Sequence, residues 1–117
     1  VHTDEGKQRQ AALLAFSAFP ELKHVILVDD DVDPFDSDDV LWAMNTRFQG
    51  DKDIITIPGV RCHPLDPSSS PEYADSISDV GISCKTIYDC TVPFHLKDRF
   101  KRAAFLEVDP HHWLKDW

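Results

Sequence analysis

The sequence contains few of the residues on which several classes of protein depend. Its four glycines are spread along 117 residues, so no glycine-rich loop is available to cradle a phosphate group. Its cysteines, Cys62, Cys84 and Cys90, are odd in number and form no C-x-x-C pair, which argues against a disulfide framework and a zinc site. No apolar run is long enough to cross a membrane. We therefore expect a soluble, reduced, cytoplasmic protein.

Positive charge is also scarce. Twelve Lys and Arg against twenty-one Asp and Glu give a formal net charge of −9 at pH 7. Such a surface repels a phosphate backbone and an anionic membrane, so we expect neither nucleic acid nor a membrane as a partner. Hydrophobic residues make up 42% of the chain, enough for a single domain over residues 1–117. Because Val1 stands in place of Met and residues 2–6 are typical of a turn after a strand, we expect a fragment whose first strand is truncated.

Apolar residues at helical spacing predict two helices, over residues 6–19 and 38–48. Asp36 or Ser37 is placed to cap the second helix, because both side chains can accept a hydrogen bond from a free backbone N–H of its first turn. A short third helix is expected over 95–104.

Short apolar runs rich in β-branched residues predict buried strands over 24–28 and 53–58, and an alternating pattern predicts a third strand over 81–90. The residues between the second and third strands, 59–80, hold three prolines and a run of serines, which predicts a long irregular loop. Because strands and helices alternate, we expect an α/β fold. It would be a small three-layer module with a mostly parallel sheet and right-handed crossover helices.

An acidic run follows the first predicted strand. Asp29, Asp31 and Asp33 fit the first ligand positions of a calcium loop, but Pro34 and Val40 stand where that loop needs Gly and Glu. Calcium binding is therefore disfavoured.

Two other interpretations of the acidic run stay open. A D-x-D motif after a strand is also found in nucleotide-sugar transferases, where it binds a metal diphosphate, and a fragment of such an enzyme fits the motif. In the plainer interpretation, Asp30 and Asp33 cap turns and helix starts at the carboxyl edge of the sheet.

Four segments of the chain carry a resemblance to a known family. They are KHVILVDDDVD (23–33), DVLWAMNTR (39–47), IPGVRCHPLDPS (57–68) and KTIYDCTVP (85–93). In this order and at this spacing they resemble the C-terminal domain of the UbiD family, over nearly the whole chain from Gly6. The combination of RCHPLDPS with DCTVP looks most like the branch that acts on hydroxybenzoates such as gallate and protocatechuate, and on pyrrole-2-carboxylate.

The resemblance implies part of a reversible, non-oxidative decarboxylase, a carboxy-lyase that uses prenylated FMN with manganese and potassium. In the family these groups, and the Glu-Arg-Glu network that handles the proton, belong mainly to an N-terminal domain. We therefore expect no catalytic residue and no metal ligand in this chain, and no cofactor bound to it alone. Activity would require the flavin-binding domain of the same protein.

The resemblance also implies a contact with the substrate. The loop after the second strand matches the family segment that faces the substrate ring, which implies His63 and Leu65 as substrate-binding residues. His63 would hydrogen-bond a polar group on the ring, and Leu65 would pack against its flat face. An aromatic carboxylic acid is the expected substrate.

Assembly is a second implied role, because this domain in the family carries much of the contact between subunits of a homo-oligomer. The tail over about 105–117 contains Phe105, Trp113 and Trp117, and we expect it to pack either on the body of the domain or on a partner. The alternative to an enzyme fragment is a stand-alone acidic α/β binding or regulatory module without catalysis.

Overall fold

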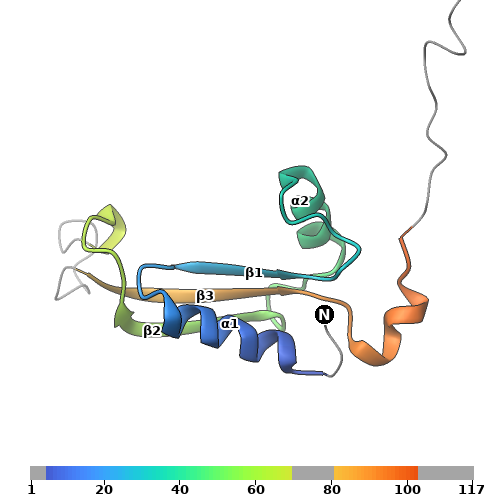
Figure 1. The fold of residues 1–117 in the computed structure, drawn as a ribbon, viewed down its shortest axis with the longest axis horizontal. Coiled ribbons are helices and arrows are strands. Elements are labelled where there is room, and N and C mark those ends of the chain that lie inside the picture. Colours follow the sequence, from blue (N-terminus) through green and yellow to red (C-terminus); the bar gives the residue numbers. More distant parts are fainter. Residues whose placement is uncertain (1–4, 70–80, 103–117) are drawn as a thin grey trace, which may run out of the picture.

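The computed structural model describes residues 5–69 and 81–102. Their elements follow the predicted order (Figure 1): α1 (Lys7–Ala18), β1 (His24–Val28), α2 (Ser37–Thr46), β2 (Ile54–Arg61), η1 (Pro67–Ser69), β3 (Ile82–Cys90) and η2 (Phe94–Arg99). The last helix is a 3₁₀-helix that ends before residue 100, and so is shorter than the helix predicted over 95–104. The tail with Phe105, Trp113 and Trp117, and the start of the chain where a truncated strand was expected, lie outside the described residues.

The described strands form a mixed sheet in the order β1-β3-β2. β1 runs parallel to β3, whereas β2 runs antiparallel to it, so the prediction of a mostly parallel sheet is wrong. A parallel return needs a long crossover, usually a helix, but the segment after β2 was already predicted to be irregular, which suits a hairpin. The pairing of β2 with β3 shifts register between Ile57 and Val60, around Gly59 with a φ of 69°.

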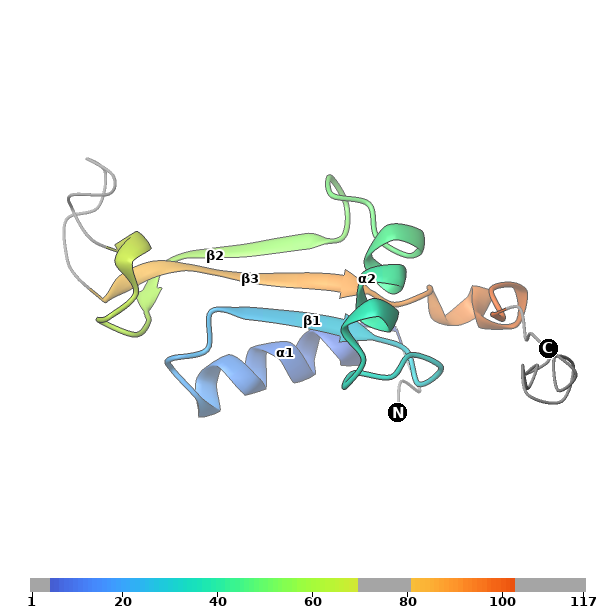
Figure 2. The same cartoon turned by 90° about the horizontal axis from the view of Figure 1, so that it is seen from above.

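Helices lie on both faces of the sheet, α1 on one and α2 on the other (Figures 1 and 2). Under α1, the buried Ala12 and Phe16 contact Ile87 of the central strand. Around α2, a second cluster joins Ala43 to Cys90. The two clusters use opposite faces of β3 because successive side chains of a strand point to opposite sides.

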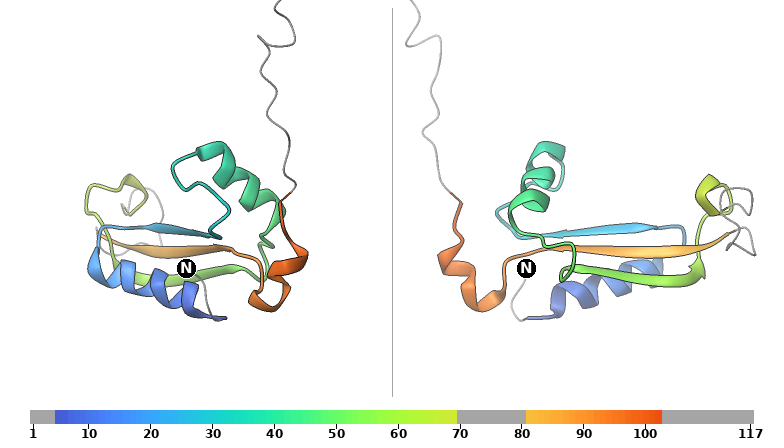
Figure 3. Two further views of the ribbon diagram at one scale, coloured as in Figure 1. Left: turned by 45° about the vertical axis from the view of Figure 1, so that its right-hand side comes forward. Right: turned by 180° about the vertical axis from the view of Figure 1, so that it is seen from behind.

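α2 stands over one end of the sheet only (Figure 3). No other described element covers the rest of that face, where Ile26 and Ile54 are 41% and 39% exposed. The prediction that β1 is buried on both faces is therefore wrong in this chain, because β1 is an edge strand with one covered face. Among the described residues, no helix combines the length and the apolar character that a membrane span requires.

Candidate functional site

The loop that follows β2 holds the predicted substrate-binding residues. The Nδ1 atom of His63 accepts a hydrogen bond of 3.0 Å from the backbone N–H of Leu65. Because Nδ1 acts as the acceptor, the neutral ring carries its proton on Nε2 and presents a donor there. The Nε2 atom lies 3.8 Å from Oε1 of Glu21.

Leu65 lies beside this histidine and is 81% exposed. The loop thus presents a hydrogen-bond donor and an apolar side chain within three residues of each other. An exposed leucine gains about 1.5–3 kcal/mol when its side chain is fully buried, so this surface favours contact with an apolar group.

Asp66 holds the loop in shape. Its side chain accepts hydrogen bonds from the backbone N–H and the hydroxyl of Ser68, at 2.9 and 2.7 Å. Its other carboxylate oxygen accepts a hydrogen bond of 2.7 Å from Nζ of Lys23, which lies 43 residues away in the sequence. The bond from Lys23, with those from Ser68, holds the pKa of Asp66 far below its usual range.

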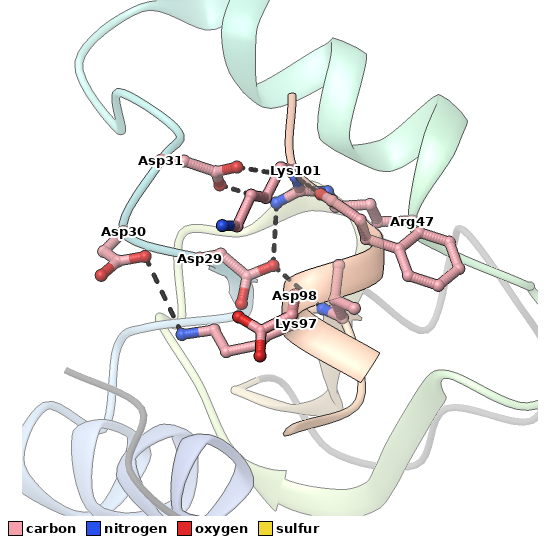
Figure 4. A pocket seen from close by; sticks show the side chains of 9 residues that line it. Asp29, Asp30, Asp31, Arg47, Lys97, Asp98 and Lys101 are labelled. Carbon is pink, nitrogen blue, oxygen red and sulfur yellow. Dashed lines mark hydrogen bonds and ion pairs between the residues drawn. The ribbon is translucent and has the colours of Figure 1, made fainter. Parts of the chain in front are cut away.

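A second polar cluster lies where β1 and β3 end, around a cavity of about 240 Å³ (Figure 4). The Arg47 guanidinium donates two hydrogen bonds to Asp31, at 2.7 and 2.8 Å, and one to Asp29 at 2.9 Å. The side chains of Arg47 and Asp29 are only 4% and 3% exposed. The hydrogen bond from Arg47 lowers the pKa of Asp31.

The same cluster fixes the segment that follows β3. Asp29 Oδ2 accepts a bond of 2.9 Å from the backbone N–H of Val92, and Arg47 donates to the carbonyl of Phe100 at 3.2 Å. Arg102 donates to both carboxylate oxygens of Asp39, at 2.8 and 3.0 Å. Asp29, Asp31 and Arg47 therefore connect α2 to residues 91–102, and we call these three residues the clasp.

The contacts of this clasp bear on the interpretations of the acidic run. Asp29 and Asp31 are engaged by a guanidinium, which competes with any metal ion for their oxygens, and the described residues contain no group of three His, Cys, Asp or Glu that could hold a metal. Asp33 accepts from the backbone N–H of Phe35 at 2.9 Å, which confirms a turn-capping role. Asp30 differs from the prediction, since the contact of its carboxylate is with Lys97 at 3.9 Å.

One helix cap also matches the sequence: Asp36 accepts a hydrogen bond of 3.0 Å from the backbone N–H of Asp38. The hydrogen bonds that Lys23 donates to Asp66, and Arg47 to the aspartates after β1, were not predicted. Both residues lie in segments that carried the family resemblance, and that was the only signal for them in the sequence.

Comparison with known proteins places the chain in a family. The model of the 3-octaprenyl-4-hydroxybenzoate carboxy-lyase C-terminal domain, UbiD_C, matches residues 2–90. The chain belongs to the UbiD family. This confirms the resemblance seen in the sequence.

Two of the similar proteins reported below are named as decarboxylases. The chain is 62% identical over 114 residues to gallate decarboxylase of Lactiplantibacillus plantarum, covering 96% of this chain and 23% of that protein. It is 64% identical to a 3,4-dihydroxybenzoic acid decarboxylase of Enterobacter cloacae, with a TM-score of 0.84 over 97% of this chain and 23% of the other. The UbiD-class enzyme HmfF of Pelotomaculum thermopropionicum, in complex with FMN, is 33% identical, with a TM-score of 0.76 over 89% of this chain and 22% of the other. The chain thus spans about a quarter of the length of these relatives.

Proposed function

We propose that the chain is the C-terminal domain of a prenylated-FMN-dependent decarboxylase of hydroxybenzoates, and that it forms one wall of the substrate pocket. Identity above 60% to a gallate decarboxylase and to a 3,4-dihydroxybenzoic acid decarboxylase, over nearly the whole chain, carries this proposal. The same identity favours an enzyme fragment over a stand-alone binding or regulatory module. The reaction is a reversible, non-oxidative loss of the carboxyl group from the aromatic ring.

The proposed part of this chain is to bind and orient the ring. His63 donates from Nε2 to a ring hydroxyl, because its Nδ1 is held as an acceptor by the backbone of Leu65. Leu65, exposed in this chain, packs on the flat face of the ring. A pocket that satisfies a substrate hydroxyl discriminates strongly against a ring without it, since the donor would then be buried without a partner.

Prenylated FMN and its manganese and potassium ions belong, in this proposal, to the remainder of the protein. The chain has no glycine-rich phosphate loop, and the described residues hold no metal-binding group, so these residues do not by themselves fit the cofactor or its ions. FMN is present in the structure of the related UbiD-class enzyme HmfF, of which this chain covers 22%.

The proposed partners are the flavin-binding domain of the same protein and a further copy of the subunit. Exposed apolar side chains near the C-terminal end of α1 support this, because Leu13, Leu14 and Phe19 are 43%, 69% and 54% exposed. Such side chains are often covered by neighbouring domains or subunits. A dimeric form is known for an evolved HmfF, a related enzyme.

The test is decarboxylation by the full-length protein, produced together with a flavin prenyltransferase, on gallate, protocatechuate and pyrrole-2-carboxylate. We expect turnover of a hydroxybenzoate, with kcat/KM reduced on the order of ten- to a hundredfold in His63→Ala, the usual range for a lost polar contact. His95→Ala, at an exposed histidine of η2, is the matched control and should keep the wild-type rate. Absence of turnover of all three acids by the wild type would refute the substrate assignment.

A further inference from the structure

Residues 19–23 form a corner between α1 and β1, and the central strand β3 donates hydrogen bonds to its backbone carbonyls. The Lys85 side chain crosses under it, and its Nζ donates to the carbonyl of Pro20 at 2.6 Å and to the carbonyl of Leu22. Lys85 is only 5% exposed, and a buried ammonium needs such acceptors to offset its loss of water. The backbone N–H of Thr86 adds a bond of 3.0 Å to the carbonyl of Lys23.

Two side chains of this corner reach the loop of His63 and Leu65: Glu21, whose Oε1 lies 3.8 Å from His63 Nε2, and Lys23, which makes the shorter contacts. Lys23 Nζ donates to Asp66 Oδ2 at 2.7 Å and to Ser68 Oγ at 2.5 Å. The corner and the loop are far apart in the sequence and are joined here by an ion pair whose side chains are 32% and 18% exposed.

Asp66 also forms hydrogen bonds with the backbone of the loop. Its carboxylate binds the N–H of Ser68, its carbonyl accepts from the N–H of Ser69 at 3.1 Å, and its own N–H donates to the carbonyl of His63 at 3.0 Å. Hydrogen bonds of one aspartate thus reach backbone groups from residue 63 to residue 69. The orientation of the His63 ring depends in turn on the backbone N–H of Leu65.

We propose that Lys23 is a positioning residue for the substrate. Lys85 fixes the corner, Lys23 ties the corner to Asp66, and Asp66 sets the loop so that His63 and Leu65 meet the ring. The inference rests on the proposed substrate contact of His63. A misplacement of a binding group by about 1 Å costs on the order of a hundredfold in rate, so an anchor remote from the substrate can matter this much.

The test uses the full-length holoenzyme with Lys23→Met and Lys23→Arg, assayed on the hydroxybenzoate that the wild type decarboxylates. We expect Lys23→Met to lower kcat/KM by about tenfold or more, and Lys23→Arg to restore most of it because the cation can still donate to Asp66. In a His63→Ala background, Lys23→Met should have little further effect, since the two substitutions disturb the same contact. An undiminished loss in that background would overturn the proposal, because Lys23 would then act by another route.

Hydrogen exchange separates failure of the anchor from failure of the substrate contact. In Lys23→Met holoenzyme without substrate, the backbone amides of Ser68 and Ser69 should exchange faster than in the wild type, whereas the amide of Asp89 in β3, which donates to the carbonyl of Asp53, should not change. Unchanged exchange at Ser68 and Ser69 would overturn the anchoring role whatever the kinetics. If exchange does respond but His63→Ala keeps the full kcat/KM, the anchor holds and the proposed substrate contact, with the positioning role built on it, is refuted.

Discussion

Replacing Arg47 by methionine is expected to loosen the segment after β3. Arg47 forms an ion pair with Asp29, and both side chains are almost fully buried, at 4% and 3% exposure. Among the described residues, the second carboxylate oxygen of Asp29, which is buried, has no hydrogen-bond partner. Removing one partner of a buried ion pair costs about 3–5 kcal/mol, because an uncompensated charge is left behind. Methionine keeps much of the apolar volume of the arginine, so the loss is chiefly electrostatic.

Native-state hydrogen exchange at the amide of Val92 measures this loss in the full-length protein. That amide donates to Asp29 Oδ2 at 2.9 Å, so it opens when the clasp opens. At about 1.4 kcal/mol for each factor of ten, its protection should fall by roughly a hundred- to a few thousandfold.

Arg102→Met is the matched control for Arg47→Met. Both guanidinium groups lie over the Trp42 ring, at 4.0 Å for Arg102 and 4.9 Å for Arg47, but the pair of Arg102 with Asp39 is more exposed, at 31% and 17%. Its removal should therefore change the protection of Val92 much less. Adding Asp29→Asn to Arg47→Met should restore part of the protection, because the orphaned charge is removed. A fall for Arg47→Met no larger than that for Arg102→Met would refute the reasoning.

Two further predictions concern titratable groups. Because the bond from Lys23 holds the pKa of Asp66 far below the ordinary 3.8, the stability it contributes is present above that pH and is lost as pH falls further. Acid unfolding of the full-length protein should therefore begin at a higher pH in Lys23→Met than in the wild type, and identical acid transitions would contradict this. Burial, with the charges of Asp89 and Asp53, raises the pKa of Cys90 to about 11, so its thiolate is scarce at neutral pH. We expect iodoacetamide to label the partly exposed Cys84 before Cys90, as read by mass spectrometry, and faster labelling of Cys90 would show that it is not enclosed.

The positions of the elements were predictable from the sequence because they depend on local periodicity. The helix expected over 6–19 is α1, and the strand expected over 24–28 has the same bounds as β1. The direction of β2 was not predictable in this way, because alternation of strands and helices does not say which neighbour a strand joins. β2 pairs antiparallel with β3, and in the described part of the loop between them, residues 62–69, the helical element is the short η1.

For the candidate site, the sequence predicted which residues take part but not the contacts between them. His63 and Leu65 followed from the family resemblance, and their role is still a prediction. The contacts of Lys23 with Asp66 and of Arg47 with Asp29 join residues far apart in the chain, so they exist only once the sheet has brought these segments together. An acidic run such as 29–36 reads as a cation site from its charges alone, and the guanidinium that engages it becomes visible only in the fold.

The outer edges of β2 and β1 differ in how readily another strand could pair with them. β2 carries Pro58, which has no N–H to offer, and an irregular register between Ile57 and Val60, and both features hinder the addition of another strand. β1 has neither feature, its Ile26 is 41% exposed on the face of the sheet, and no other described strand pairs with its outer edge. Separated from the domain that we propose as its neighbour, the chain would therefore tend to aggregate through β1, so soluble expression of this piece should depend on covering that edge.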